Sequence, residues 1–279
     1  MIPTEFSIEN EVAIVTGGGR GIGKAIALAL AEAGVDVTVV ARTREQIEQT
    51  ANEVRQLGRG ALAITADVSQ ENQVKDVVER TLSEFSKIDI LVNNAGIGSG
   101  RKPVTYIPGI KFPGWELAGD NWNKPLSLED WHRVMNTNLT SVFLFAQAVG
   151  PHMLSRRKGK IINISSNSAD LGSPLSSVYC VSKAGLSSFT RCLASEWAPF
   201  GICVNAIAPG ATRTEMMDKY RKNQEMEKMI LEVIPEGRMA EPREIALLAL
   251  FLASQASNFI NGETLYVDGG QRAHGPGKV

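Results

Sequence analysis

The chain has 279 residues, of which 43% are hydrophobic and 21% are charged, a composition with ample material for a globular core. Its 29 basic and 30 acidic residues give a net charge of −1, which excludes the basic footprint of a dedicated nucleic-acid binder and an acidic disordered chain. Three cysteines, an odd and sparse set, argue against a disulfide-stapled scaffold, and no metal-ligand spacing joins them to the three histidines.

The N-terminus and the apolar runs indicate in which compartment the protein is found. No basic segment followed by an apolar run stands at the N-terminus, so we expect no signal peptide. The longest apolar helix-like run, residues 245–253, is too short to span a bilayer. We therefore expect a cytoplasmic protein with no membrane partner.

Short β-branched runs alternate with longer helical patterns along the chain. In chain order we predict strand 12–16, helix 23–33, strand 35–40, helix 44–57, strand 61–66, helix 70–85, strand 89–92, helix 128–150 ending before Pro151, strand 160–165, helix 178–198, strand 202–207, helix 242–253 and strand 264–267. This alternation is typical of an α/β fold. We predict a single domain, residues 1–279, with a doubly wound parallel β-sheet and helices on both faces.

Residues 98–127 interrupt the alternation. The segment contains four prolines and four aromatic residues, Trp115 and Trp122 among them, and it has no periodicity. An irregular segment of this length is usually functional or disordered. We interpret it as an insert that forms either a lid over the functional site or a contact between subunits.

A glycine-rich loop, Thr16-Gly17-Gly18-Gly19-Arg20-Gly21-Ile22-Gly23, comes directly after the first predicted strand. A strand, a glycine turn and a helix in this order form a phosphate cradle, because backbone N–H groups and the positive helix end face the anion. Gly18 to Lys24 also matches G-x-x-x-x-G-K, the phosphate loop of nucleoside triphosphatases, but Ala25 replaces the hydroxyl residue that holds magnesium. A tight turn without any ligand is the third interpretation.

The spacing that fits best is T-G-x-x-x-G-x-G, through Gly17, Gly21 and Gly23. Four further motifs come after it in order: N-N-A-G at 93–96, Y-x-x-x-K at 179–183, P-G at 209–210 and V-D-G-G at 267–270. Together they resemble the short-chain dehydrogenase/reductase family, from about residue 11 to residue 270. The resemblance implies a Rossmann-type fold, reversible hydride transfer between a nicotinamide and a secondary alcohol or ketone, and a homo-oligomer, either a dimer or a homotetramer.

The end of the second predicted strand bears on the cofactor. An NAD enzyme of this fold usually has Asp or Glu there to bind the ribose 2′-OH. This chain has Arg42 instead, while Asp36 lies at the opposite end of the strand. Arg42 and Arg20 suit a 2′-phosphate, so we predict that NADP(H) is preferred over NAD(H), unless both arginines are only solvated surface groups.

The resemblance also implies the cofactor contacts. Asp67 and Val68 would contact the adenine, although Asp67 also suits the N-cap of the next helix. Thr214 would lie near the carboxamide, with Thr212 as the alternative. The full implied set is Gly17, Gly19, Arg20, Gly21, Ile22, Gly23, Arg42, Asp67, Val68, Asn94, Ala95, Gly96, Tyr179, Lys183, Pro209, Gly210, Thr212 and Thr214.

Tyr179 and Lys183 are four residues apart and share one face of a helix. The resemblance makes Tyr179 the general acid/base, with its pKa lowered from near 10 by the Lys183 ammonium and the nicotinamide ring. It makes Ser166, thirteen residues earlier, a donor to the substrate oxygen, with Ser165 as its structural neighbour. It also makes Asn138 the holder of a water that links Lys183 to solvent, although a plain buried hydrogen bond is the alternative.

These observations predict an NADP(H)-dependent alcohol dehydrogenase or ketone reductase with Asn138, Ser166, Tyr179 and Lys183 as its catalytic residues. A non-catalytic nucleotide-sensing module on the same fold is the alternative, against which the complete set of four argues. The expected partner is a small-molecule alcohol or ketone, with no metal and no nucleic acid.

Overall fold

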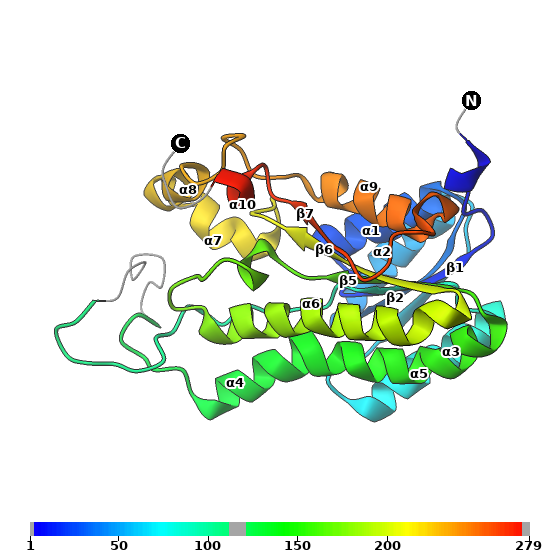
Figure 1. Cartoon of the computed structure of the whole chain (residues 1–279), viewed down its shortest axis with the longest axis horizontal. Coiled ribbons are helices and arrows are strands. Elements are labelled where there is room, and N and C mark those ends of the chain that lie inside the picture. The colour runs from blue at the N-terminus through cyan, green and yellow to red at the C-terminus, as the bar shows by residue number, and fades with distance from the viewer. Residues whose placement is uncertain (1–2, 112–120, 275–279) are drawn as a thin grey trace.

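The computed structural model describes residues 3–111 and 121–274. The centre of this part is a sheet of seven strands, all paired in parallel, in the order β3-β2-β1-β4-β5-β6-β7 (Figure 1). The strands are β1 (Val12–Thr16), β2 (Asp36–Ala41), β3 (Ala61–Thr65), β4 (Ile90–Asn93), β5 (Gly159–Ile164), β6 (Ile202–Pro209) and β7 (Thr264–Val267). The predicted doubly wound parallel sheet is confirmed.

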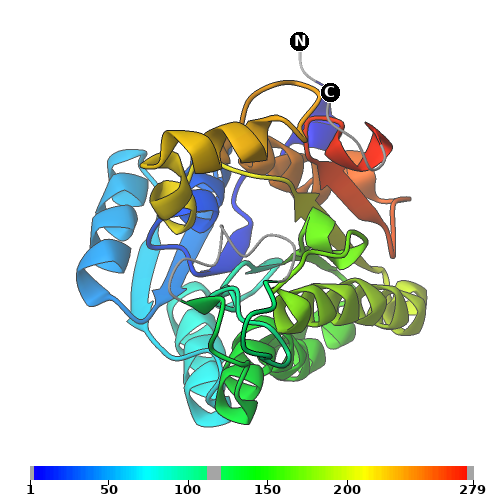
Figure 2. The same cartoon turned by 90° about the vertical axis from the view of Figure 1, so that its left-hand side faces the viewer.

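Helices cover both faces of the sheet (Figures 1 and 2). One face is covered by α1 (Gly21–Glu32), α2 (Arg44–Gln56) and α9 (Pro242–Ala253). The other is covered by α3 (Glu71–Phe85), α5 (Ser141–Arg156) and α6 (Ser177–Trp197).

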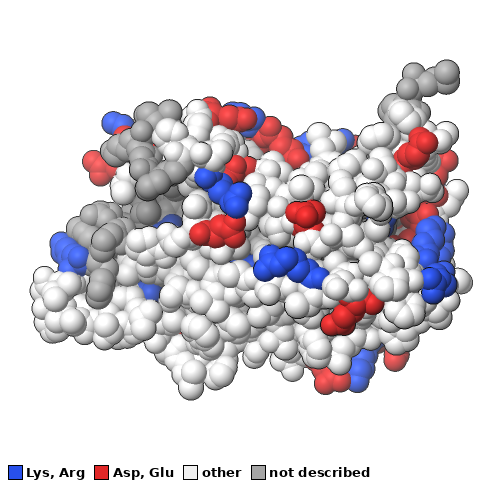
Figure 3. Space-filling view, viewed as in Figure 1, with Lys and Arg blue, Asp and Glu red and all other residues white. Residues whose placement is uncertain are grey.

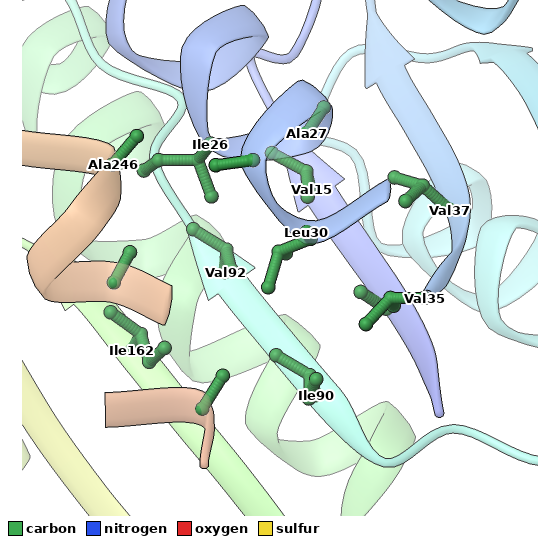
Figure 4. Packing of buried hydrophobic residues seen from close by; sticks show 14 of the residues in the cluster. Val15, Ile26, Ala27, Leu30, Val35, Val37, Ile90, Val92, Ile162 and Ala246 are labelled. Atoms are coloured by element: carbon green, nitrogen blue, oxygen red, sulfur yellow. The ribbon is translucent and has the colours of Figure 1, made fainter. Parts of the chain in front are cut away.

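The two faces form two separate apolar clusters, because successive side chains of a strand point to opposite faces. In β1, Val15 belongs to the cluster under α1, whereas Ile14 belongs to the cluster under α3 and α5. Figure 4 shows Ile26 and Leu30 of α1 close to Val15 and to Val92 of β4. The sheet is thus buried on both sides, and the strand ends are where function can be placed.

The predicted helix over 128–150 differs from the structure. It is formed by α4 (Leu128–Met135) and α5, joined by a π-helical turn, Asn136–Thr140. The expectation that the helix ends before Pro151 is wrong, because α5 continues to Arg156. Pro151 is exposed, so water can solvate the carbonyl group that the proline leaves without a donor.

Three short helices near the C-terminal end lie outside the predicted elements. They are α7 (Asp218–Arg221), α8 (Gln224–Leu231) and α10 (Gln271–His274). No helix in the described part of the chain combines the length and the hydropathy that crossing a bilayer requires. On the face drawn in Figure 3, basic and acidic side chains are interspersed, in keeping with the net charge of −1.

The strand order places the site. β1 lies between β2 and β4, so the order of the strands reverses there, and ligands of such sheets bind outside the carboxyl ends at this point. Because all seven strands are parallel, the loops after β1, β2, β4, β5 and β6 emerge at the same edge. Motifs that lie far apart in the sequence therefore meet at this carboxyl edge.

Candidate active site

The backbone angles and the close packing of the glycine loop exclude larger residues at three positions. Gly17 and Gly21 have φ angles of +64° and +53°, in the left-handed region that favours glycine. A Cβ atom on Gly23 would lie 2.3 Å from Asn94 Nδ2 and 2.3 Å from the carbonyl oxygen of Gly17. The third glycine of the motif is therefore dictated by packing, as a close helix–strand approach demands.

Asn94 joins the glycine loop to the end of β4. Its Nδ2 donates to the carbonyl oxygens of Thr16 and Gly17, at 2.9 and 3.2 Å. Thr16 Oγ1 in turn accepts from the backbone N–H groups of Asn94 and Ala95, both at 3.0 Å. These bonds hold the loop in front of α1. At the start of α1, Arg20 occupies the N-cap position without a side-chain cap, so the first N–H groups of the helix face the loop.

Arg20 and Arg42 are both exposed, and Arg42 directly follows β2. Asp36 is the first residue of β2, where it accepts from Arg59 Nε at 3.1 Å and from the Gly60 N–H at 2.7 Å. Asp36 therefore lies at the end of the strand opposite to the glycine loop, too far along β2 to bind a ribose there, as the sequence predicts. The carboxyl end of β2 instead leads into the cationic side chain of Arg42.

Asp67 lies after β3 at the same edge. Its Oδ1 accepts from the N–H of Ser69 at 3.0 Å and from the hydroxyl of Ser69 at 2.7 Å. Helix α3 begins at Glu71 with Gln70 as its N-cap, so the interpretation of Asp67 as the N-cap is wrong. Burial works against the charge of Asp67, but the bonds from Ser69 and the nearby Arg42 guanidinium outweigh it and lower its pKa.

Tyr179 and Lys183 lie in the first two turns of α6. Lys183 Nζ donates to the Ile164 carbonyl oxygen at 2.7 Å and lies 5.9 Å from the centroid of the Tyr179 ring. The Lys183 side chain is buried, and burial lowers the pKa of its ammonium to about 8. Burial also raises the pKa of Tyr179, against a smaller opposite effect of its hydrogen bond with Ser166. The residues of the chain by themselves therefore raise the pKa of Tyr179, and the expected lowering, which includes the positive nicotinamide ring, stays a prediction.

The two serines after β5 have different surroundings. Ser165 Oγ donates to the Lys183 carbonyl oxygen at 3.1 Å and lies 3.0 Å from Ser187 Oγ, so it ties β5 to α6. Ser166 Oγ is hydrogen-bonded with Tyr179 and accepts from the Ser168 N–H at 3.1 Å. Ser166 is thus the serine that faces the tyrosine, and Ser165 packs behind it.

Asn138 lies in the π-helical turn between α4 and α5 and is fully buried. Its Oδ1 accepts from the Ile97 N–H at 2.8 Å, and its Nδ2 donates to the Ile97 carbonyl oxygen at 2.9 Å. A Cβ atom on Gly96 would lie 3.4 Å from Lys183 Nζ and 3.5 Å from Asn138 Oδ1. Gly96 therefore lies beside both Lys183 and Asn138, and a Cβ atom there would touch both side chains. Such π turns are frequent at functional sites.

Ser182 is a site residue that sequence reasoning missed. Its hydroxyl donates to the Tyr179 carbonyl oxygen at 2.7 Å and accepts from Asn138 Nδ2 at 3.1 Å. It is fully buried and links Asn138 to the helix turn that holds Tyr179 and Lys183. It stands inside the Y-x-x-x-K motif, but a serine in a helix is no signal by itself, and only the contact with Asn138 reveals it.

The loop after β6 closes the site from the other side. A Cβ atom on Gly210 would lie 2.8 Å from Asp268 Cα, so the P-G and V-D-G-G motifs touch. A Cβ atom on Gly21 would lie 3.2 Å from Thr214 Cγ2, so Thr214 approaches the glycine loop. Thr212 is buried and donates to the Gly210 carbonyl oxygen at 3.1 Å. Of the two threonines, Thr214 is the better placed for a ligand at the loop.

The insert is described only in part, and Trp115 lies outside the described residues. At its neck the Leu126 N–H donates to the Pro103 carbonyl oxygen at 2.8 Å, and Lys102 Nζ donates to Asp130 Oδ2 at 2.6 Å. The two ends of the insert thus lie side by side, anchored on the first turn of α4. Close to the neck, Arg101 Nε donates to the hydroxyl of Tyr220 in α7 at 2.9 Å.

The comparisons with known proteins agree with this geometry. Residues 11–225 match the family model described as short chain dehydrogenase. The chain belongs to the short-chain dehydrogenase/reductase family. It is 38% identical over 273 residues to a 2-dehydro-3-deoxy-D-gluconate 5-dehydrogenase of Escherichia coli (strain K12), covering 97% of this chain and 98% of the relative. It is 38% identical over 262 residues to a 3-oxoacyl-[acyl-carrier-protein] reductase of Synechocystis, covering 93% and 96%.

Among solved structures, a gluconate 5-dehydrogenase from Burkholderia cenocepacia J2315, in complex with NADP and tartrate, superposes with a TM-score of 0.83. It is 35% identical and covers 96% of this chain and 98% of its own. These relatives are dehydrogenases or reductases, and the chain is accordingly an oxidoreductase acting on CH–OH or ketone groups. The triphosphatase interpretation of the glycine loop is therefore wrong.

Proposed function

We propose that this protein oxidises a secondary alcohol or reduces the corresponding ketone with NADP(H), with Tyr179 as the general acid/base. The observation that carries the proposal is the arrangement around Tyr179: Ser166 is hydrogen-bonded with it, and the Lys183 ammonium lies 5.9 Å from its ring. When bound, the nicotinamide accepts or supplies the hydride. The glycine loop suits its pyrophosphate, because Gly17 and Gly21 have φ angles of +64° and +53° and the uncapped N–H groups at the start of α1 face the loop.

The protein's own residues transfer the proton and stabilise the charge on the substrate oxygen. In reduction, the Tyr179 hydroxyl gives its proton to the substrate oxygen as that oxygen gains negative charge; in oxidation, the Tyr179 phenolate takes it back. Ser166 Oγ donates a hydrogen bond to the same oxygen and stabilises the developing charge. Lys183 favours the phenolate, and the room beside Gly96 lets Asn138 and Lys183 share a water for proton return.

The proposal is tested by Tyr179→Phe, which removes the proton and keeps the ring. We expect NADPH-linked turnover to fall at least about 10³-fold while NADPH binding, measured by fluorescence titration, stays within about twofold. Ser166→Ala and Ser165→Ala form a matched pair, of which only the first should lower kcat strongly. Turnover that survives Tyr179→Phe would refute the role of the tyrosine.

The preference for NADP(H) over NAD(H) is a separate proposal, supported by the position of Arg42 directly after β2 and by the NADP in the Burkholderia relative. Replacing Arg42 by Ala should raise the Kd of NADPH by about tenfold or more, since a charge-assisted hydrogen bond contributes about 1.5–3 kcal/mol. The Kd of NADH should change by less than about twofold. Arg44→Ala, two residues further on and also exposed, is the control. Equal losses for both cofactors would refute a contact with the 2′-phosphate.

For the substrate, we propose a hydroxylated carboxylic acid related to gluconate. The relatives named for gluconate derivatives support this class, and so does Arg101, a cation at the neck of the insert, five residues beyond Gly96. The test is a panel with NADP(H) absorbance as the readout: D-gluconate and 5-dehydro-D-gluconate first, then simple secondary alcohols and a 3-oxoacyl thioester. Turnover of the thioester alone would contradict the proposed class.

We further propose that residues 1–279 form one domain, that the insert at 98–127 is a wall of the substrate pocket or a subunit contact, and that the protein is a cytoplasmic homo-oligomer. The test replaces residues 105–124 by two glycines, which keeps the hydrogen-bonded residues Pro103 and Leu126 of the neck. A changed substrate preference at an unchanged number of subunits, measured by sedimentation, would favour the wall. A changed number of subunits would favour the subunit contact.

A further inference from the structure

A short turn links the end of β5 to the loop before α6. Ser166 is the N-cap of the 3₁₀ turn Asn167–Ala169, and Asp170 is its C-cap. The Ala169 N–H donates to the Ser166 carbonyl oxygen at 3.0 Å, and the Asp170 N–H donates to the Asn167 carbonyl oxygen at 3.2 Å. Ser166 and Asp170 are therefore the two ends of one small rigid unit.

The C-terminal elements hold this unit from outside. Asp170 Oδ2 accepts from the Tyr266 hydroxyl of β7 at 2.5 Å and from Arg272 Nε of α10 at 2.9 Å. The guanidinium of Arg272 lies 4.2 Å from the centroid of the Tyr266 ring, so the three side chains form one cluster. Asn167 Nδ2 also donates to Gln271 Oε1 at 2.7 Å. Figure 2 shows β7 and α10, in orange-red and red, next to each other at the upper right.

The cluster of Asp170, Tyr266 and Arg272 orients the Asp170 carboxylate more than it stabilises the fold. The side chains of Asp170 and Arg272 are 41% and 50% exposed, and ion pairs of such exposure contribute little to folding. Three side chains joined at one carboxylate nevertheless define its direction. Burial raises the pKa of Tyr266, and the bond to Asp170 raises it further, to about 12, so its hydroxyl stays a donor at neutral pH.

We propose that Asp170, held by Tyr266 and Arg272, is a positioning residue that aims the Ser166 hydroxyl at the substrate oxygen. This inference rests on the proposed function, in which Ser166 donates to that oxygen. It assigns a part in catalysis to residues 266–272, which lie beyond the stretch 11–225 that the family model matches. A displaced hydroxyl costs rate because the hydrogen bond must be strongest in the transition state.

The first test is a double-mutant cycle in the reduction of 5-dehydro-D-gluconate or of the panel ketone with the highest turnover. Asp170→Ala should lower kcat about tenfold with KM within about twofold. In the Ser166→Ala background, the same substitution should change kcat by less than about twofold, because the group that it positions is gone. Asp170→Asn, which keeps an acceptor for Tyr266, should recover part of the loss. Asp76→Ala removes a similarly exposed ion pair with Arg80 in α3 and should leave kcat unchanged.

The second test measures the conformation of the 3₁₀ turn and does not depend on catalysis. Hydrogen exchange of the Ser168 N–H, which donates to Ser166 Oγ, should be at least about tenfold faster in Asp170→Ala and unchanged in Asp76→Ala. Unchanged exchange overturns the inference, as does an equal loss of kcat in both serine backgrounds or a raised KM at constant kcat. Faster exchange in a protein whose wild type turns over none of the panel overturns the proposed function, and with it the catalytic purpose of Asp170.

Discussion

At the amino edge of the sheet Asp89 is buried in a cluster of charged partners, whereas at the carboxyl edge Lys183 is buried beside a backbone carbonyl and a tyrosine. Asp89 Oδ1 accepts from Arg156 Nη2 at 2.7 Å, and its Oδ2 accepts from the Val12 N–H at 3.0 Å. Burial favours the neutral acid, but hydrogen bonds from Glu11 and Arg156 outweigh it and lower the pKa of Asp89 to about 2.

Lys183 has the opposite balance. Burial dominates and lowers the pKa of its ammonium to about 8, into the range where a proton can be exchanged near neutral pH. At the amino edge, charged and polar partners offset the cost of burying the Asp89 carboxylate. At the carboxyl edge, the partners of Lys183 do not offset the cost of burying its ammonium. The first arrangement stabilises the fold, and the second is suited to chemistry.

The largest expected effect separates activity from stability at Lys183. Lys183→Met should lower kcat/KM by about 10³-fold or more, since the charge that favours the Tyr179 phenolate is lost. The free energy of unfolding should change by less than about 1 kcal/mol, because relief from burying a cation offsets the lost bond to the Ile164 carbonyl. Urea unfolding with steady-state kinetics checks both, and a variant that fails to fold would break the comparison.

At Asp89 the pattern should be reversed. Asp89→Asn removes the charge that faces Arg156 and should lower the free energy of unfolding by about 2–3 kcal/mol. Its kcat should stay within about twofold of the wild type, because Asp89 precedes β4 at the edge opposite the site. Asp76→Asn, on the exposed face of α3, is the control for removing an acid. If kcat falls while the free energy of unfolding is unchanged, Asp89 acts in catalysis, which would contradict its purely structural role at the amino edge.

The pH dependence of stability gives a further test of the role of Asp89. The pKa of Asp89 in the fold lies below its ordinary value of 3.8, so its stabilisation is fully present above pH 3.8 and is lost as pH falls toward 2. This shift corresponds to about 2 kcal/mol. The stability difference between the wild type and Asp89→Asn should therefore shrink over this window, measured by chemical unfolding at each pH. A difference that stays constant from about pH 5 to about pH 2 would show that the charge of Asp89 is not its source.

The smallest effect concerns the room between Lys183 and Asn138. A methyl group at Gly96 would make ordinary contacts, at 3.4 Å to Lys183 Nζ and 3.5 Å to Asn138 Oδ1. Gly96→Ala should leave the melting temperature nearly unchanged but lower kcat by about tenfold, since a water shared by the two groups is displaced. Gly98→Ala, where a Cβ meets nothing within 4 Å, is the control. Equal activity of both variants would count against the shared water.

Most of the site's residues can be named from the sequence because they belong to motifs of definite spacing. The spacing of Gly17, Gly21 and Gly23 predicts a cradle, and the structure shows why side chains are excluded there. The family resemblance, with its interval of thirteen residues, implies Ser166 rather than Ser165, and Ser166 is the one bonded with Tyr179. Their roles in catalysis stay predictions.

Other features depend on contacts that no local pattern indicates. The N-cap interpretation of Asp67 is wrong because the chain makes one more turn at Ser69 before α3 begins. The π-helical turn around Asn138 is expected as continuous helix from the sequence, and the bonds of Asn138 to Ile97, 41 positions away, have no local signal. Ser182 and Asp170 escape sequence reasoning for the same reason.

The sequence by itself determined the alternation of strands and helices, the glycines of the loop and the family, because backbone propensity and motif spacing are local properties. The tertiary structure alone decided which side chains surround Ser182 and Asn138 and how the C-terminal elements hold the turn at Ser166. It also decided the pKa directions of Tyr179 and Lys183, because desolvation depends on everything that is packed around a group. An ammonium four residues after a phenol is a pattern in the sequence, but its proton affinity belongs to the fold.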